Sequence, residues 1–173
     1  MSTNLQFIVS KSASSVSSLS IENCFTAKYN VYQVIINNID FVSADLNWRF
    51  INASGVVSSS NYDSAVLLQR SYGNFADLKT AGGTEFRSIG FYDQSSGIGS
   101  GKGGATTITI YNPFNSSTYS FAHWRNAGVS SIGTPARKGT GVLKVAESHT
   151  GINFLDGGGA SVLGVTASIY GVK

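Results

Sequence analysis

GINFLDGGGASVLGVTASIYGVK, residues 151–173, is the stretch that decides the fold. It predicts a strand, a glycine-rich turn and a second strand that runs to the last residue. In that second strand apolar side chains alternate with small or polar ones, the apolar set being Leu163, Val165, Ala167 and Ile169. A period of two indicates a strand with one face on a core. We therefore expect the polypeptide to end inside its own sheet rather than in a frayed tail.

The rest of the chain repeats this kind of pattern. About nine or ten short runs rich in β-branched and aromatic residues are separated by turn signals every 8–12 residues, which is typical of a sandwich or barrel. No convincing amphipathic helix appears, although Ala65–Asp77 is compatible with either a strand and loop or a short helix. We predict one all-β domain over residues 1–173, a jelly-roll-like antiparallel β-sandwich.

Composition argues against several classes of function. Charged residues make up 12% of the chain and the net charge is +3, with the basic residues scattered except for the pair Arg137 and Lys138. Nucleic-acid binding needs clustered cations, so none is expected. The single cysteine, Cys24, permits neither an intrachain disulfide nor a thiolate zinc site, and its apolar flank predicts a buried thiol.

Targeting signals are not recognisable in the sequence. No apolar run approaches the roughly 20 residues that a membrane-spanning helix needs. The first ten residues, MSTNLQFIVS, lack the basic start and long apolar stretch of a secretory signal. We expect synthesis in a cytoplasm and no membrane insertion.

The motifs of catalysis are incomplete. Gly97–Gly104 resembles a phosphate-binding loop but lacks its first glycine and the Ser or Thr after Gly-Lys, and a strand follows it instead of a helix. His123 and His149 are the only histidines, in no metal-binding spacing and without a Gly-x-Ser-x-Gly elbow elsewhere. The sequence predicts no enzyme, no cofactor and no metal site.

The segment Tyr119–Asn126 offers the best candidate for binding. As a strand it places Tyr119, Phe121 and His123 on one face and Trp124 on the other. An exposed aromatic ring beside an arginine suits sugar stacking or protein contact. The candidate ligand-binding residues are Trp124, Arg125 and Tyr92; the alternative is that Trp124 belongs to the core, as we expect for Trp48.

Short motifs near both ends resemble those of a known family. They comprise the run Leu5–Val9, a serine-rich stretch, a Tyr-x-x-Tyr strand at Tyr29–Tyr32, the strand Leu46–Phe50 and the closing Ile169-Tyr-Gly-Val-Lys173. This combination resembles small virion structural proteins of tailed, cyanophage-like bacteriophages, which recur as tail-fibre domains. The middle of the chain, residues 65–146, matches only loosely.

The resemblance implies a cofactor-free β module of the virion, made in the host cytoplasm. Its expected partners are other virion proteins, further copies of itself (a trimer by analogy with jelly rolls) and a glycan of the host surface. A tail-fibre or tail-attachment component is the leading hypothesis. A capsid decoration protein and a free carbohydrate-binding module with Trp124 and Tyr92 as stacking residues are the alternatives.

Overall fold

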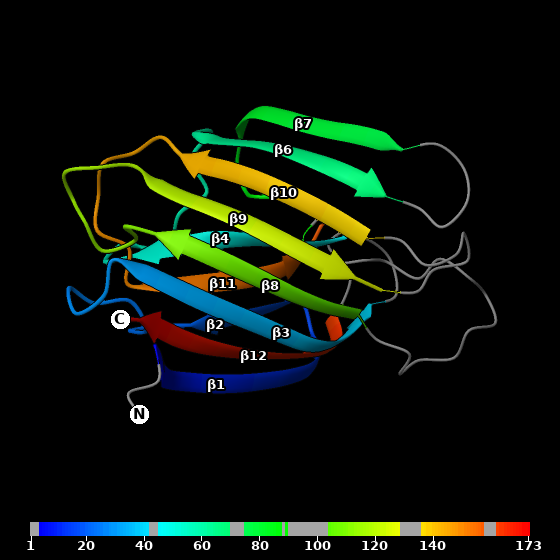
Figure 1. The fold of residues 1–173 in the computed structure, drawn as a ribbon, viewed down its shortest axis with the longest axis horizontal. Helices are drawn as coiled ribbons and strands as arrows, with labels where there is room; N and C mark the ends of the chain where they lie inside the picture. The colour runs from blue at the N-terminus through cyan, green and yellow to red at the C-terminus, as the bar shows by residue number, and fades with distance from the viewer. Residues whose placement is uncertain are drawn as a thin grey trace.

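A computed structural model describes residues 4–41, 45–69, 75–87, 89, 104–128, 136–157 and 162–173. Within these ranges the chain forms twelve strands and no helix (Figure 1). The strands are β1 (Leu5–Val16), β2 (Ser18–Ile21), β3 (Val31–Phe41), β4 (Leu46–Asn52), β5 (Gly55–Val56), β6 (Tyr62–Gln69), β7 (Ala76–Gly83), β8 (Gly104–Tyr111), β9 (Ser120–Ala127), β10 (Ala136–Leu143), β11 (Gly151–Asp156) and β12 (Val162–Val172).

The strands build two antiparallel sheets packed face to face. Eight strands follow the order β1-β12-β3-β8-β9-β10-β6-β7, and four follow the order β2-β11-β4-β5. Figure 1 shows the larger sheet in front and the smaller one behind it. The predicted all-β antiparallel sandwich is confirmed, whereas its finer description as a jelly roll stays a prediction.

Strand β12 lies within the larger sheet, as its alternation predicts. It pairs antiparallel with β1 on one side and with β3 on the other, so that Ser168 faces Ser10 and Ile35. Val165, Ala167 and Ile169 turn inward and are buried. The C-terminal strand is therefore held by two ladders of backbone hydrogen bonds and by the core.

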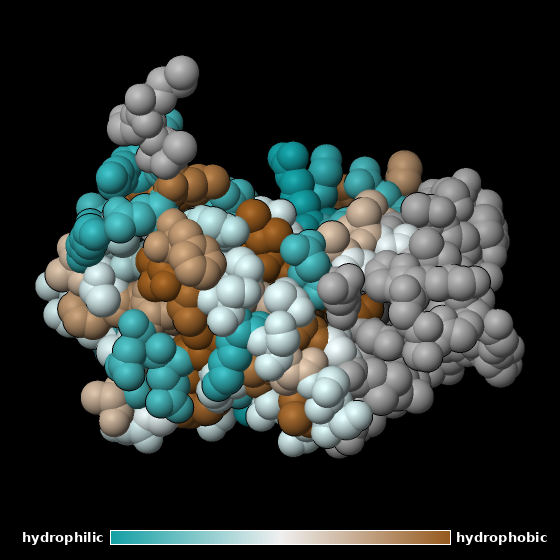
Figure 2. Space-filling view, turned by 90° about the horizontal axis from the view of Figure 1, so that it is seen from below, coloured by the Kyte–Doolittle hydropathy of each residue, from teal (hydrophilic) through white to brown (hydrophobic). Residues whose placement is uncertain are grey.

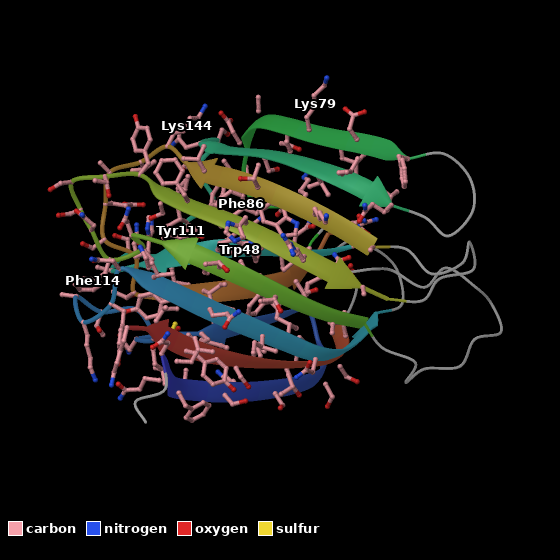
Figure 3. The ribbon with its side chains drawn as sticks, in the orientation of Figure 1. Trp48, Lys79, Phe86, Tyr111, Phe114 and Lys144 are labelled. Carbon is pink, nitrogen blue, oxygen red and sulfur yellow. The ribbon has the colours of Figure 1, made fainter. Side chains whose placement is uncertain are left out.

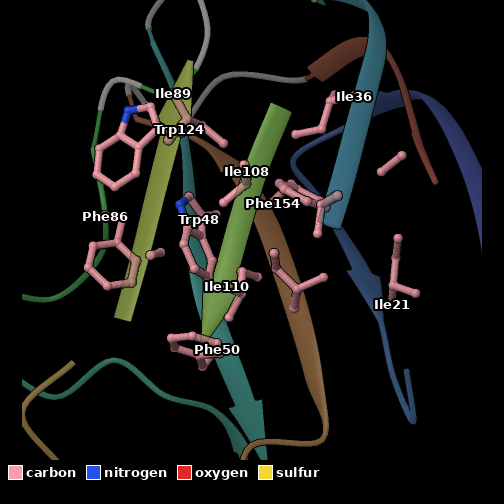
Figure 4. Packing of buried hydrophobic residues seen from close by; sticks show 14 of the residues in the cluster. Ile21, Ile36, Trp48, Phe50, Phe86, Ile89, Ile108, Ile110, Trp124 and Phe154 are labelled. Carbon is pink, nitrogen blue, oxygen red and sulfur yellow. The ribbon is translucent and has the colours of Figure 1, made fainter. Parts of the chain in front are cut away.

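Aromatic rings fill the space between the sheets (Figure 4). Trp48 and Phe50 from β4 pack against each other at 4.9 Å between ring centroids, and Phe86 lies 4.6 Å from Trp48. Tyr62 packs edge-on against Phe86 at 4.8 Å. Phe86 reaches this place because its backbone bonds to that of Trp48 in both directions. These rings form an aromatic cluster within a core that also holds many aliphatic side chains, and Trp48 belongs to the core as expected.

Glycines on the inner face of β10 make room for two of these rings. A Cβ atom at Gly139 would lie 2.1 Å from the Trp124 ring, and one at Gly141 would lie 2.4 Å from Phe86. Each ring lies against a position of the strand that carries no side chain. The two glycines are therefore part of the packing of the aromatic cluster.

The structure decides between the alternatives for one segment and corrects the expectation for another. Ala65–Asp77 contains the end of β6 and the start of β7, with Phe75 just before β7 and residues 70–74 outside the described part, so its described residues form no helix. The run Glu85–Tyr92 has the aromatic and β-branched residues of a strand, but its described residues form only the bridge between Phe86 and Trp48. Most of the glycine-rich stretch 97–104 lies outside the described residues.

Candidate functional site

The outer face of the eight-stranded sheet is where side chains are free to meet a partner. Strand β9 shows how it is built, since its burial alternates strictly from residue to residue. Ser120, Ala122 and Trp124 turn into the core, while Phe121 and Arg125 point outward. The two-faced strand expected at Tyr119–Asn126 is confirmed, with the aromatic Tyr119 and Phe121 on its exposed side.

The three candidate ligand-binding residues fall in different environments. Trp124 is 1% exposed and rests on Gly139, so its ring is closed to a ligand and the core interpretation is the correct one. Arg125 is exposed on the outer face. Tyr92 lies outside the described residues. A stacking platform built on Trp124 is therefore excluded in this fold, while Arg125 remains available.

Apolar side chains line up across one end of the outer face. The register places them side by side on six neighbouring strands, and we call this set the apolar row: Leu5, Val172, Val31, Tyr111, Phe121 and Val142. Leu5 is 40% exposed and Phe121 46%. At the usual strand spacing, six strands span about 24 Å. A contiguous exposed apolar patch marks an interaction surface.

Next to the apolar row the surface continues with one aromatic pair and then becomes hydroxyl-rich. Phe7, which is 57% exposed, packs edge-on against Tyr170 at 5.7 Å. Further along the same two strands, Ser10 bonds to Ser168 through their hydroxyl groups at 2.9 Å. Figure 2 views the molecule from the β1 side and shows hydrophobic residues reaching the surface among hydrophilic ones.

A cluster of basic side chains occupies the other end of the outer face. Arg125 on β9 stands directly opposite Lys138 on β10, and Lys79 on β7 lies farther out, where Figure 3 labels it. Between β10, β6 and β7 the surface is hollowed into a shallow groove of about 420 Å³. This end of the face carries positive charge, whereas the apolar row carries none.

A serine, a histidine and a glutamate meet at the end of the sandwich, a constellation that the sequence did not reveal. Ser120 Oγ lies 3.0 Å from His149 Nδ1, and His149 Nε2 lies 3.2 Å from Glu147 Oε1. The imidazole also stacks on Phe50 at 4.4 Å. Both Ser120 and His149 are 0% exposed, so no substrate can reach the hydroxyl. The arrangement satisfies buried polar groups and does not form a nucleophilic site.

The environment of His149 keeps it neutral. Burial lowers the pKa of the imidazole, and this effect exceeds the opposing influence of the Glu147 carboxylate. A neutral imidazole carries one ring proton; when Nε2–H donates it to the Glu147 carboxylate, Nδ1 is left to accept the proton of the Ser120 hydroxyl, with the carbonyl oxygen of Pro113 3.2 Å from Nδ1. Asn52 Nδ2 donates to the second oxygen of Glu147 at 3.0 Å. The histidine therefore joins the loop before β11 to the start of β9.

We expect acid to destabilise the protein through His149. Its pKa is lower in the folded chain than the ordinary value of 6.5, so the unfolded chain takes up the proton first. The free energy of unfolding is then highest above pH 6.5 and falls as the pH drops below it. Urea unfolding at pH 8, 7, 6 and 5 measures this. His149→Gln should flatten the profile, whereas His123→Gln, which alters an exposed histidine, should not. An unchanged profile for His149→Gln would contradict the assignment.

The outer face of the smaller sheet carries a compact ion-pair network. Glu85 is buried and accepts hydrogen bonds from Arg49 and from Asn47, each at 2.8 Å, with Arg87 3.5 Å away. Because each oxygen of the carboxylate is bonded, the network fastens the Phe86 segment to β4. The polar groups of this network bind one another and stabilise the fold.

The remaining candidates of the sequence are structural. Cys24 is buried, as expected, and burial raises the pKa of its thiol to about 12. In the described part of the chain, no three His, Cys, Asp or Glu side chains come together in a way that could hold a metal ion. The described residues also include no helix of the length and hydropathy that crossing a membrane requires.

Among the described residues, the apolar row and the basic groove are the features of the outer face of the larger sheet that suit contact with a partner. No protein-family model matches the chain, and neither does any curated protein.

Proposed function

We propose that this chain is a non-enzymatic virion structural protein of a tailed bacteriophage, a component of the tail fibre or its attachment region. The observation that carries the proposal is the apolar row, six outward side chains in register on six strands. Such a row suits contact with other virion proteins, because burying it removes apolar surface from water over a rigid sheet. The sequence resemblance to phage virion proteins is the reason for assigning the chain to a phage particle.

The rest of the molecule is consistent with a mechanical role. A two-layer sandwich with an aromatic core presents its outer face without large rearrangement. The low share of charged residues, 12%, is compatible with a surface partly covered by neighbours. Homo-oligomer formation, with three copies as the expected number, belongs to the same proposal, and light scattering of the purified protein tests it.

Mass spectrometry of purified particles tests the proposal directly. A few copies per particle support a tail component, and hundreds of copies support the alternative of a capsid decoration protein. Absence from the particle contradicts both. The free carbohydrate-binding module is the second candidate, favoured by the exposed rings of Tyr119 and Phe121.

Phe121→Asp should block assembly without unfolding the protein. The Phe121 side chain is 46% exposed, so its loss should change the free energy of unfolding by no more than about 1 kcal/mol. An unpaired carboxylate in the covered row is costly to desolvate. We expect at least a tenfold drop in copies per particle, measured by mass spectrometry after complementation.

The matched control is Phe75→Asp, which places the same charge on a 69% exposed ring outside the apolar row. It should enter particles at the normal level. Normal incorporation of Phe121→Asp would show that the apolar row is not the contact surface.

A further inference from the structure

The groove on the outer face combines an aliphatic floor with basic walls, and we call it the basic groove. Ala65 and Leu67 of β6 form its floor, Lys138 and Thr140 of β10 one wall, and Lys79 of β7 the other. The register confirms that these side chains share a face, since Lys138 lies opposite Leu67 and Lys79 opposite Ala65. The groove is open along its length.

The cations of the basic groove are not neutralised. Some other basic groups pair closely with a carboxylate, as in Lys144 with Asp63 at 2.8 Å and Arg137 with Asp45 at 2.7 Å, whereas Lys11 and Lys28 make no ion pair within the described part of the chain. Among the described residues, Lys79, Lys138 and the adjacent Arg125 make no ion pair. The only acidic group lining the groove is Asp77. Three cations against one carboxylate leave a surplus of two positive charges.

The placement of two of these cations is costly for folding alone. Arg125 and Lys138 are directly opposite each other on β9 and β10. Like charges at opposite positions of neighbouring strands destabilise a sheet. An anion held between them would remove that repulsion, so the pair is a favourable place for an anionic ligand.

We infer that the basic groove binds an acidic glycan, a polysaccharide carrying carboxylate or phosphate groups. This inference rests on the proposed function, in which the protein contacts a host surface, and it names the ligand and the site. Lys79, Lys138 and Arg125 lie on three different strands and together span four, so a ligand with several anionic groups matches them better than one small anion. The floor of Ala65 and Leu67 offers contact to the apolar faces of sugar rings.

The strands around the groove favour a glycan over an acidic peptide. β6 and β10 lie inside the sheet, each bonded to a strand on both sides, so their backbones cannot accept an added peptide strand. β7 is the edge strand, and its free edge lies on the side away from β6. Recognition there relies on side chains, namely ammonium and guanidinium groups and the hydroxyl group of Thr140. These are donors for carboxylate, phosphate and sugar oxygens.

Binding to four probes at low salt tests the inference by calorimetry. A hexagalacturonate oligosaccharide represents carboxylate glycans, a phosphorylated mannan oligosaccharide represents phosphate glycans, and cellohexaose and hexaglutamate are the neutral and peptide comparisons. We expect saturable binding of at least one acidic glycan, with hexaglutamate at least tenfold weaker and cellohexaose silent. Which acidic glycan binds identifies the source of the charge. Equal binding of hexaglutamate, or no binding of either acidic glycan, overturns the inference.

Charge-removing variants locate the site. Lys138→Gln and Lys79→Gln should each weaken acidic-glycan binding at least fivefold while leaving the melting temperature unchanged, because both side chains are exposed. Lys28→Gln removes the same charge from the loop before β3 and should change binding less than twofold. If Lys28→Gln weakened acidic-glycan binding equally, the loss of affinity would reflect the overall charge of the protein. The assignment of the binding site to the basic groove would then be wrong.

The glycan-binding test of the basic groove and the particle test of the proposed function can fail independently of each other. Protein that is present in purified particles but does not bind acidic glycans refutes the basic groove alone. Protein that binds acidic glycans but is missing from particles refutes the virion assignment and retains the site as a glycan-binding surface.

Discussion

A chain that stops at residue 163 is expected not to fold. Residues 164–173 form most of β12, the strand that joins β1 to β3. Their removal takes Val165 and Ile169 out of the core, a loss of about 3–6 kcal/mol at the usual 1.5–3 kcal/mol per buried side chain. It also removes the strand with which β1 pairs and one of the two strands with which β3 pairs. Together these losses approach the whole stability of a typical domain.

Circular dichroism during heating and gel filtration of the refolded chain measure this effect. The truncated chain should show no cooperative transition and should elute as aggregates. Deleting the exposed Lys173 alone is the matched control and should leave a normal transition. A soluble truncation that melts cooperatively would contradict the position of β12 between two strands.

Trp124→Ala should lower the free energy of unfolding by about 3–5 kcal/mol, the usual cost of truncating a buried tryptophan. The ring is 1% exposed and packs 5.9 Å from Phe86 between ring centroids. Urea unfolding gives the difference. A loss below 1 kcal/mol would show that Trp124 does not belong to the core.

The pairing of Trp124 with Gly139 supplies an internal control. Gly139→Ala in the normal chain should cost about 1–3 kcal/mol, since its Cβ would lie 2.1 Å from the indole ring. In the Trp124→Ala background the same change should cost nothing, because the new methyl group enters the vacated space. Equal costs in the two backgrounds would mean that the two residues are not in contact.

Local features of the fold were predictable from the sequence because they depend on alternation alone. Val165, Ala167 and Ile169 alternate with small polar residues, and this pattern is enough to assign a half-buried strand. The same rule gave the two faces of the segment Tyr119–Asn126. It did not say which face is buried, since aromatic residues stand on both. The pairing of β9 with β10 answers this question, because it places Gly139 opposite Trp124, where the missing side chain leaves room for the indole ring in the core.

Features that depend on strand order were beyond the sequence. Ser120 and His149 are 29 residues apart in the sequence. They meet because the start of β9 and the loop before β11 lie at the same end of the sandwich. Likewise, the apolar row joins Leu5 to Val172 through a register that no local pattern encodes. Arg125 was recognised as a candidate, but its neighbour Lys138 across the strands was not.

The pairing of the first strand with the last also determines how the fold would respond to tension applied at its two ends. Leu5 lies opposite Val172, and the amide of Lys173 donates to the carbonyl of Asn4 at 2.9 Å, so both ends emerge at the same corner (Figure 1). Tension between these two points would open the β1–β12 hydrogen bonds one after another, like a zipper, because each bond lies across the strands. If the protein were attached through the outer face of the larger sheet instead, the force would be distributed over many strands at once.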